Sequence, residues 1–227
     1  MFYFDSTLIL LLPGLFLGLW AQFKVRSAHE KYAKVRTRRG VPASELVRYL
    51  LQKNGMNDIA VAQVAGSLTD HFDPKTDTLR LSEEVYGSDS VSAVGIAAHE
   101  AGHALQKIEG YGPLALRTAI VPVVNIGSYL SWPLFIAGLA FSFDPLVTAG
   151  IAVFGLAVLF SLITLPVEFD ASRRAKRMLA DSGYFEEEEL QGVGKVLSAA
   201  ALTYVASFIS ALLQMVRLIL IAQRRRR

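Results

Sequence analysis

The residues with the clearest chemistry are His99, Glu100 and His103, which stand in the sequence His-Glu-Ala-Gly-His. They lie in residues 91–107, whose pattern predicts a helix with candidate N-caps at Ser88, Asp89 and Ser90. Histidines four residues apart project from one helix face about one turn apart, a spacing at which two imidazoles bind one zinc ion. Glu100 would stand beside the ion without binding it, where it can take a proton from a zinc-bound water. The pentapeptide therefore predicts zinc-dependent hydrolysis.

Small residues surround the two histidines in this predicted helix. Because they lack long side chains, a second element or a substrate could approach the helix backbone closely. These residues are Ala97, Ala98, Ala101, Gly102 and Ala104.

The composition predicts a membrane protein. Of the 227 residues, 52% are hydrophobic, which is more than a soluble domain of this size usually contains. The chain has no cysteine, so a metal site must use histidines and carboxylates instead of thiolates. The net charge of +3 gathers beside apolar segments rather than forming a broad basic surface, and we therefore expect no nucleic-acid partner.

Four segments are apolar enough to be compared with the roughly 20 residues that a helix needs to cross a bilayer. The first lacks a basic start and a cleavage site for a secretory signal, so it predicts an uncleaved anchor. Only Asp144 separates the second from the third, which predicts a transmembrane helical hairpin. The four segments are residues 6–23, 118–143, 145–167 and 196–216.

Basic residues beside these segments predict how the chain is oriented. Residues 24–39 contain seven lysines or arginines and one acid, which is typical of a cytoplasmic loop. A second basic group, Arg173, Arg174, Lys176 and Arg177, follows the hairpin. The histidine helix and the segment after the hairpin should therefore lie together on the cytoplasmic face of the cell membrane.

The fourth apolar segment has a polar stripe along one helix face. If residues 196–216 cross the membrane, the basic cluster at residues 224–227 lies outside, against the usual charge rule. We favour a helix that packs its polar side on the protein or lies in the interface, while a span with its polar face turned inward stays open. The stripe consists of Thr203, Ser207, Ser210, Gln214 and Arg217.

The region from residue 41 to residue 116 has the pattern of a small globular fold. A helix is expected from Pro42 to Gly55, a strand at residues 59–64, a hairpin at residues 68–81 and a short helical turn from Ser82. The edge of this hairpin could add an extended peptide as a further strand, or the hairpin could simply cover the histidine helix.

Two histidines and a water leave tetrahedral zinc one protein ligand short. Glu168 is the strongest candidate, because it is the first charge after an apolar segment and opens a predicted helix. Asp170 could orient a metal-binding histidine or pair with Arg173 or Arg174 instead.

Three residues near the predicted hairpin turn also need an interpretation. Asp70, His71 and Asp73 could form a metal cluster, but turn chemistry around Pro74 explains them better. His71 is a further candidate for stabilising an oxyanion near the zinc.

With these residues in place, the chain resembles the neutral zinc metallopeptidases of the bacterial membrane protein YugP type over nearly its whole length. The resemblance implies a multi-pass membrane metallopeptidase with His99 and His103 as zinc ligands and Glu100 as catalytic acid and base. It is carried by residues 21–25, 68–74, 97–104 and 165–172.

A more distant likeness is to the membrane gluzincins of the HtpX kind, whose third ligand stands in a Glu-Phe-x-Ala-Asp pattern. Glu168 and Phe169 match this pattern, and Ser172 stands where it has aspartate. The likeness supports Glu168 as a ligand and leaves open which group orients the histidine.

We therefore predict a mainly α integral membrane protein with a small cytoplasmic α+β zincin-like region, which contains the histidine helix and a short β-hairpin. The expected parts are an N-terminal anchor, the zincin-like region, the transmembrane hairpin, a cytoplasmic helix with the third ligand, and a C-terminal apolar helix with a basic tail. Their bounds are residues 1–23, 24–117, 118–167, 168–195 and 196–227.

The predicted function is zinc-dependent hydrolysis of peptide bonds in membrane-proximal proteins or peptides. The expected cofactor is Zn²⁺, and the expected partners are the lipid bilayer and a protein or peptide substrate. Two other functions stay open: a non-catalytic membrane scaffold with a structural zinc site, and a zinc hydrolase acting on a lipid or another amide.

Overall fold

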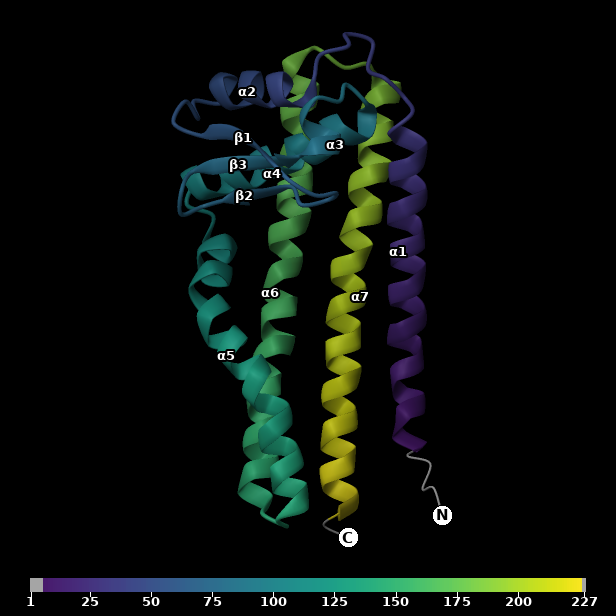
Figure 1. Cartoon of the computed structure of the whole chain (residues 1–227), viewed down its shortest axis with the longest axis vertical. Coiled ribbons are helices and arrows are strands. Elements are labelled where there is room, and N and C mark those ends of the chain that lie inside the picture. Colours follow the sequence, from purple (N-terminus) through teal and green to yellow (C-terminus); the bar gives the residue numbers. More distant parts are fainter. Residues whose placement is uncertain (1–5, 226–227) are drawn as a thin grey trace. The chain divides into compact units, whose positions relative to one another are not determined.

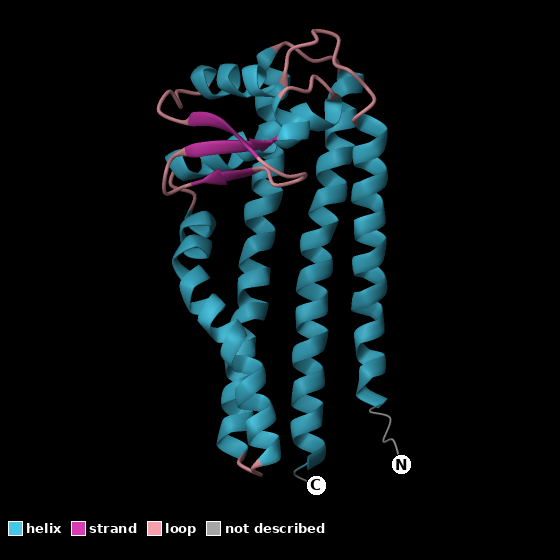
Figure 2. Ribbon diagram, viewed as in Figure 1, coloured by secondary structure: helices cyan, strands magenta, loops and turns pink. Residues whose placement is uncertain are grey.

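The computed structural model describes residues 6–225, and most of them are helical (Figure 2). Residues 1–5 of the predicted anchor, and Arg226 and Arg227 of the terminal basic cluster, lie outside the described residues. The chain divides into two compact units. The helical unit contains residues 6–21, 116–165 and 203–225 of the described chain, and the mixed unit contains residues 22–115 and 166–202.

Figure 1 labels the long helices α1, α5, α6 and α7. Each of them has residues in both units. The 3₁₀ helix η1 and α1, α5, α6 and α7 all contribute to the helical unit. Each of the four α-helices is long and apolar enough to cross a membrane, which agrees with the four predicted segments. Their bounds are Ser6–Leu11 for η1, Leu12–Tyr32 for α1, Gly112–Ala140 for α5, Asp144–Ser182 for α6 and Glu187–Arg225 for α7.

Helices α5 and α6 form the predicted hairpin in the helical unit. The turn between them contains Ser142, whose φ is +52°. A Cβ atom at Gly138 would lie 2.5 Å from the backbone nitrogen of Val147, and one at Gly150 would lie 2.7 Å from that of Phe135. The two helices therefore meet at backbone distance, which only glycine allows at these positions.

Two residues of the polar stripe of α7 contact the N-terminal helices of the same unit. Ser210 lies against Gly14 of α1, where an added Cβ would be 2.8 Å from the serine Oγ. Arg217 donates from Nε to Oγ1 of Thr7 at 3.2 Å. Ser210 and Arg217 thus face the protein, whereas Ser207 of the same stripe is exposed, and α7 is also a candidate membrane span.

The mixed unit contains the small globular fold that the sequence predicted. Strand β1 pairs parallel with β3, and β2 pairs antiparallel with β3, so the three-stranded sheet has the order β1-β3-β2. The expected strand and hairpin are confirmed, although nothing in the sequence predicted their parallel pairing. The elements are α2 (Ala43–Lys53), β1 (Ala60–Val64), β2 (His71–Asp73), β3 (Thr78–Ser82), α3 (Glu83–Tyr86) and α4 (Val91–Ile108).

A core of aliphatic side chains holds α2, α4 and the sheet together. Leu50 of α2, Leu79 and Leu81 of β3, and Val94 of α4 are fully buried in it, and Leu179 brings α6 into the same core. Because alternate residues of a strand face opposite sides, Leu79 and Leu81 point together toward the helices. The core thus fixes α4 against both the sheet and the last part of α6.

Glu168 does not open a helix, contrary to the prediction. Helix α6 continues from Asp144 to Ser182 with Pro166 inside it. Proline removes one backbone donor from a helix, but a long apolar helix tolerates this loss where neighbouring groups satisfy the freed carbonyl. Glu168 is therefore held well inside a continuous helix.

Candidate metal centre

Helix α4 presents the two histidines on one face. The helix begins where the Ser90 side chain accepts a hydrogen bond from the backbone nitrogen of Ala93 at 3.2 Å. The ring centroids of His99 and His103 are 4.8 Å apart, with the rings nearly perpendicular. Their side chains are 15% and 12% exposed, so both rings are largely shielded from water.

Glu168 of α6 lies against both histidines. Its Oε2 is 3.3 Å from Nε2 of His99 and 3.6 Å from Nε2 of His103. Donor atoms bound tetrahedrally to one zinc stand roughly 3.3–3.6 Å apart, because each lies about 2.0–2.2 Å from the ion. One donor atom from each of these three residues lies within 4.8 Å of the others, so the residues fit a single metal ion.

A glycine allows α6 to approach the histidine helix. A Cβ atom at Gly102 would lie 2.4 Å from the backbone oxygen of Ala171, which is closer than real Cβ contacts. Ala171 is itself fully buried. Of the small residues predicted to permit close approach, Gly102 therefore faces α6, and this contact brings Glu168 to the histidines.

The two histidines are supported at their other ring nitrogens by Ser172, which the likeness to gluzincins had marked as a departure, and by Gln106, which the sequence did not single out. Nδ1 of His99 lies 3.1 Å from Oγ of Ser172, and Nδ1 of His103 lies 3.0 Å from Oε1 of Gln106. Both supports have a helical spacing that could have indicated them. Gln106 follows His103 by three residues, and Ser172 follows Glu168 by four.

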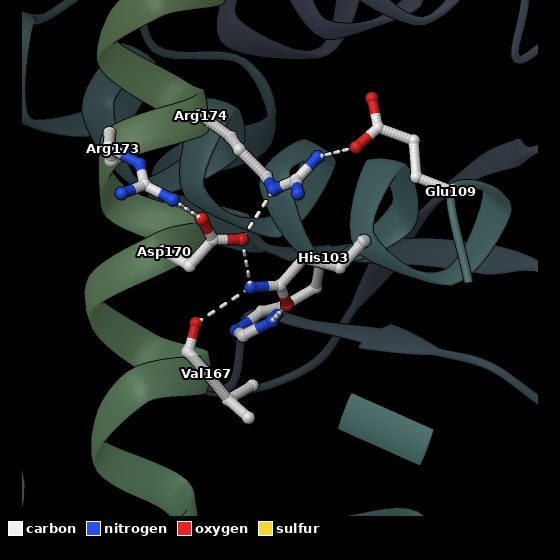
Figure 3. Close-up of polar contacts among 7 residues, drawn as sticks. His103, Glu109, Val167, Asp170, Arg173 and Arg174 are labelled. Carbon is white, nitrogen blue, oxygen red and sulfur yellow. Dashed lines mark hydrogen bonds and ion pairs between the residues drawn. The ribbon is translucent and has the colours of Figure 1, made fainter. Parts of the chain in front are cut away.

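Asp170 reaches a histidine only through another residue. Its Oδ2 accepts a hydrogen bond from Nε2 of Gln106 at 2.9 Å, and the same carboxylate pairs with Arg173 and Arg174. Figure 3 shows Asp170 between the two guanidinium groups. The two roles considered for Asp170 are thus combined, with Gln106 standing between it and His103.

Glu100 is held by the sheet. Its Oε2 accepts a hydrogen bond from the backbone nitrogen of Phe72 at 2.9 Å, and the residue is 9% exposed. Lys107 of the same helix donates to the backbone oxygen of Pro74 at 2.6 Å and pairs with Asp77. The β2–β3 hairpin is therefore fastened to α4 at two points, which favours the interpretation that it covers the helix.

The remaining predicted residues make local contacts. His71 is exposed, and its Nδ1 lies 2.8 Å from the backbone oxygen of Thr69. Asp73 accepts hydrogen bonds from Lys75 and Thr76 in the turn. Asp70 accepts two from Ser82, at 2.8 and 3.1 Å. Among the described residues, this trio does not gather as a metal cluster, and turn chemistry accounts for Asp73.

Electrostatics at His103 favours a cation. Burial lowers the pKa of His103, but the neighbouring carboxylates of Glu168 and Glu100 outweigh it, and the pKa stands above its ordinary value. A site that strengthens the binding of a proton in this way also attracts a metal ion.

Comparison with known proteins places these residues in a family. The family model described as "Putative neutral zinc metallopeptidase" matches residues 7–223. The chain belongs to this family. A curated relative, "Putative membrane protease YugP" of Bacillus subtilis (strain 168), is 48% identical over 214 residues, which cover 94% of this chain and 95% of the relative. No solved structure matches the chain.

Family membership confirms the resemblance seen in the sequence. Together with the buried His-His-Glu group, it supports Zn²⁺ as the cofactor. The four apolar helices and the name of the relative support a membrane protein.

Proposed function

We propose that this protein is a membrane-bound zinc metallopeptidase in which His99, His103 and Glu168 hold the metal and Glu100 is the general acid and base. The observation that carries the proposal is the position of Glu168. Its carboxylate is 2% exposed and lies within 3.6 Å of both histidine Nε2 atoms, although it comes from another helix. Two nitrogens and one carboxylate oxygen are typical ligands of catalytic zinc, which keeps a further position for water or substrate.

Glu100 would move the proton during peptide hydrolysis. When bound, zinc supplies a Lewis acid that polarises the substrate carbonyl and lowers the pKa of water. Glu100 takes a proton from the attacking water while the water oxygen bonds to the carbonyl carbon of the substrate. It then delivers that proton to the amide nitrogen of the substrate as the C–N bond breaks. The Phe72 N–H donates to Oε2 of Glu100, and within residues 6–225 no hydrogen bond occupies its Oε1. This second oxygen is the one that would carry the proton.

The substrates we propose are proteins or peptides close to the cytoplasmic face of the membrane. If each of the four apolar helices crosses once, the chain changes sides at each crossing. The segment between α1 and α5 and the last part of α6 then lie on the same side, and the basic groups at residues 24–39 and 173–177 favour the cytoplasm. Both halves of the zinc site belong to these segments.

The test compares Glu100→Gln with wild type in the detergent-solubilised full-length protein. Peptide cleavage should fall by roughly 10²–10⁴-fold, because proton transfer is lost, while bound zinc stays at the wild-type level. Glu168→Ala should lose both zinc and cleavage. Glu188→Gln is a matched control, since Glu188 is exposed and far along the chain from the motif. Zinc content and cleavage are measured on the same samples.

Each alternative function predicts a different result. A structural zinc site predicts a wild-type protein that holds zinc and cleaves nothing. A zinc hydrolase of another class predicts that wild type cleaves lipid or non-peptide amide substrates but no peptide. Equal peptide cleavage by wild type and Glu100→Gln would contradict the proposed role of Glu100.

A further inference from the structure

Gln106 is a fully buried polar residue beside the candidate metal centre. It lies on α4 one turn after His103 and is 0% exposed. Its side-chain amide makes three hydrogen bonds: Oε1 with Nδ1 of His103 at 3.0 Å, and Nε2 with the Val167 backbone oxygen at 2.8 Å and Oδ2 of Asp170 at 2.9 Å. A buried amide whose oxygen and nitrogen both have hydrogen-bond partners is held in one orientation.

The partners of Gln106 fix which way its amide points. A backbone oxygen and a carboxylate paired with arginines can only accept hydrogen bonds. The NH₂ group must therefore face Val167 and Asp170, and the amide oxygen must face His103. This oxygen can only accept as well, so the proton of a neutral His103 ring lies on Nδ1. Its Nε2 then carries the lone pair, and this nitrogen faces Glu168.

A series of charged residues holds Asp170, which accepts from the Gln106 amide. Asp170 is 4% exposed and pairs with Arg173 and Arg174. Arg174 also pairs with Glu109, and its guanidinium lies 5.6 Å from the centre of the Tyr111 ring. Figure 3 shows this series from Glu109 through Arg174 and Asp170 toward His103. Asp170 is thereby kept as an acceptor for Gln106.

His99 has a less specific support. The Ser172 hydroxyl near its Nδ1 can donate or accept a hydrogen bond, so the hydroxyl alone does not decide which ring nitrogen is protonated. The Gln106 amide beside His103 is fixed, so it can only accept a hydrogen bond from this ring. The two histidines of the motif are therefore oriented by different chemistry.

We propose that Gln106 is a positioning residue, whose amide oxygen sets the tautomer and ring orientation of His103 for zinc and whose NH₂ group anchors it to α6. The inference rests on the proposed function, because it requires His103 to bind the metal. Residues that hydrogen-bond a metal-binding histidine typically change metal affinity or activity by about 10–100-fold when replaced. The alternative is that Gln106 only clamps α4 to α6.

Two substitutions separate these roles. Gln106→Met removes all three hydrogen bonds, while Gln106→Glu keeps an acceptor for His103 and loses both donors to α6. Both variants should lower the thermal unfolding midpoint of the zinc-free protein, since both lose the clamp. Only Gln106→Met should raise the zinc dissociation constant, by about 10–100-fold, and alter the visible absorption of the Co²⁺-loaded protein. Gln106→Glu should stay within a few-fold of wild type in zinc affinity.

Zinc affinity is measured by chelator competition on the full-length protein in detergent. Gln191→Met is the matched control, because Gln191 is exposed and its Nε2 contacts Glu187 of the same helix at 3.3 Å. Equal zinc affinity of Gln106→Met and wild type, or equal weakening of the Met and Glu variants, would overturn the inference. If Gln106→Met does not fold, a tenfold loss of zinc affinity in Gln106→Glu alone would overturn it. A wild-type protein that binds no zinc would defeat the proposed function itself.

Discussion

The two compact units of the chain differ in where their large apolar side chains lie. In the mixed unit, leucines of α2, β3 and α6 are 0–2% exposed and form one core. In the helical unit, Phe16, Ile126 and Tyr129 are 64%, 63% and 82% exposed. The mixed unit excludes water by packing against itself, whereas the helical unit presents apolar side chains outward, as a lipid solvent requires.

The difference explains why the candidate metal centre belongs to the mixed unit. A buried carboxylate such as Glu168 and a buried amide such as Gln106 are costly unless partners surround them. The packed interior of the mixed unit supplies those partners from two helices and a sheet. A helix facing lipid cannot supply them on its outer side. We infer that the helical unit serves to hold the protein in the membrane.

Both units nevertheless use glycine for the same purpose. Gly102 permits α4 to touch α6 in the mixed unit, and Gly138 permits α5 to touch α6 in the helical unit. Substituting these glycines tests whether the two units have separate roles.

Gly102→Ala should have the largest effect. Its new Cβ would stand 2.4 Å from the Ala171 backbone oxygen, so α6 must shift with Glu168 and Ser172 upon it. Such overpacking typically costs about 1–3 kcal/mol, against a gain of about 1 kcal/mol from alanine in a helix. We expect a lower unfolding midpoint and at least tenfold weaker zinc binding, measured by chelator competition.

Gly95→Ala is the control on the same helix. Its Cβ would meet Cγ1 of Val193 at 3.3 Å, and a side chain can move where a backbone cannot. Zinc affinity should stay at the wild-type level, with stability equal or slightly higher. If both variants lose zinc to the same extent, close approach at Gly102 is not what positions Glu168.

Gly138→Ala should destabilise the helical unit while leaving zinc affinity unchanged. Its Cβ would lie 2.5 Å from the Val147 backbone nitrogen, which forces the α5–α6 hairpin apart. In detergent, the unfolding midpoint should fall by an amount that corresponds to about 1–3 kcal/mol. Gly155→Ala, whose nearest neighbour would be Sδ of Met215 at 3.9 Å, is the control. A large loss of zinc in Gly138→Ala would show that the units do not have separate roles.

The sequence predicted the four apolar helices and the candidate metal ligands by different signals. Long apolar runs were sufficient for the four candidate spans, because bilayer thickness sets their length. The spacing of His99 and His103 placed them on one helix face, and the charge of Glu168 after an apolar run marked it as unusual. These signals depend only on residues close together in the sequence, so they can be recognised without knowing the fold.

Contacts between distant elements could not be predicted in this way. Gln106 and Ser172 make their contacts because α4 and α6 pack together. The sequence of either helix alone does not indicate which residue of the other helix it will contact. The parallel pairing of β1 with β3 likewise depends on how the intervening hairpin folds back. The continuation of α6 through Pro166 was missed because proline usually ends a helix in water.

The smallest predicted effect concerns the acid dependence of stability, which should arise mainly in the mixed unit. In residues 6–21, 116–165 and 203–225 of the helical unit, Asp144 is the sole carboxyl side chain. Two aspartates of the mixed unit should respond to acid in opposite directions. Burial raises the pKa of Asp70, whereas the hydrogen bonds and charge of Arg36 lower the pKa of Asp89.

The signs follow from proton binding. With a raised pKa, folded Asp70 binds its proton more tightly than the unfolded chain, so wild type gains stability relative to Asp70→Asn as pH falls from its folded pKa toward about 3.9. Folded Asp89 binds its proton less tightly, so wild type loses stability relative to Asp89→Asn as pH falls below about 3.9. Unfolding midpoints of the zinc-free proteins, compared across this range, measure both differences. Since Asp89 pairs with a largely exposed arginine, its effect should be small, and equal slopes for the two variants would contradict these assignments.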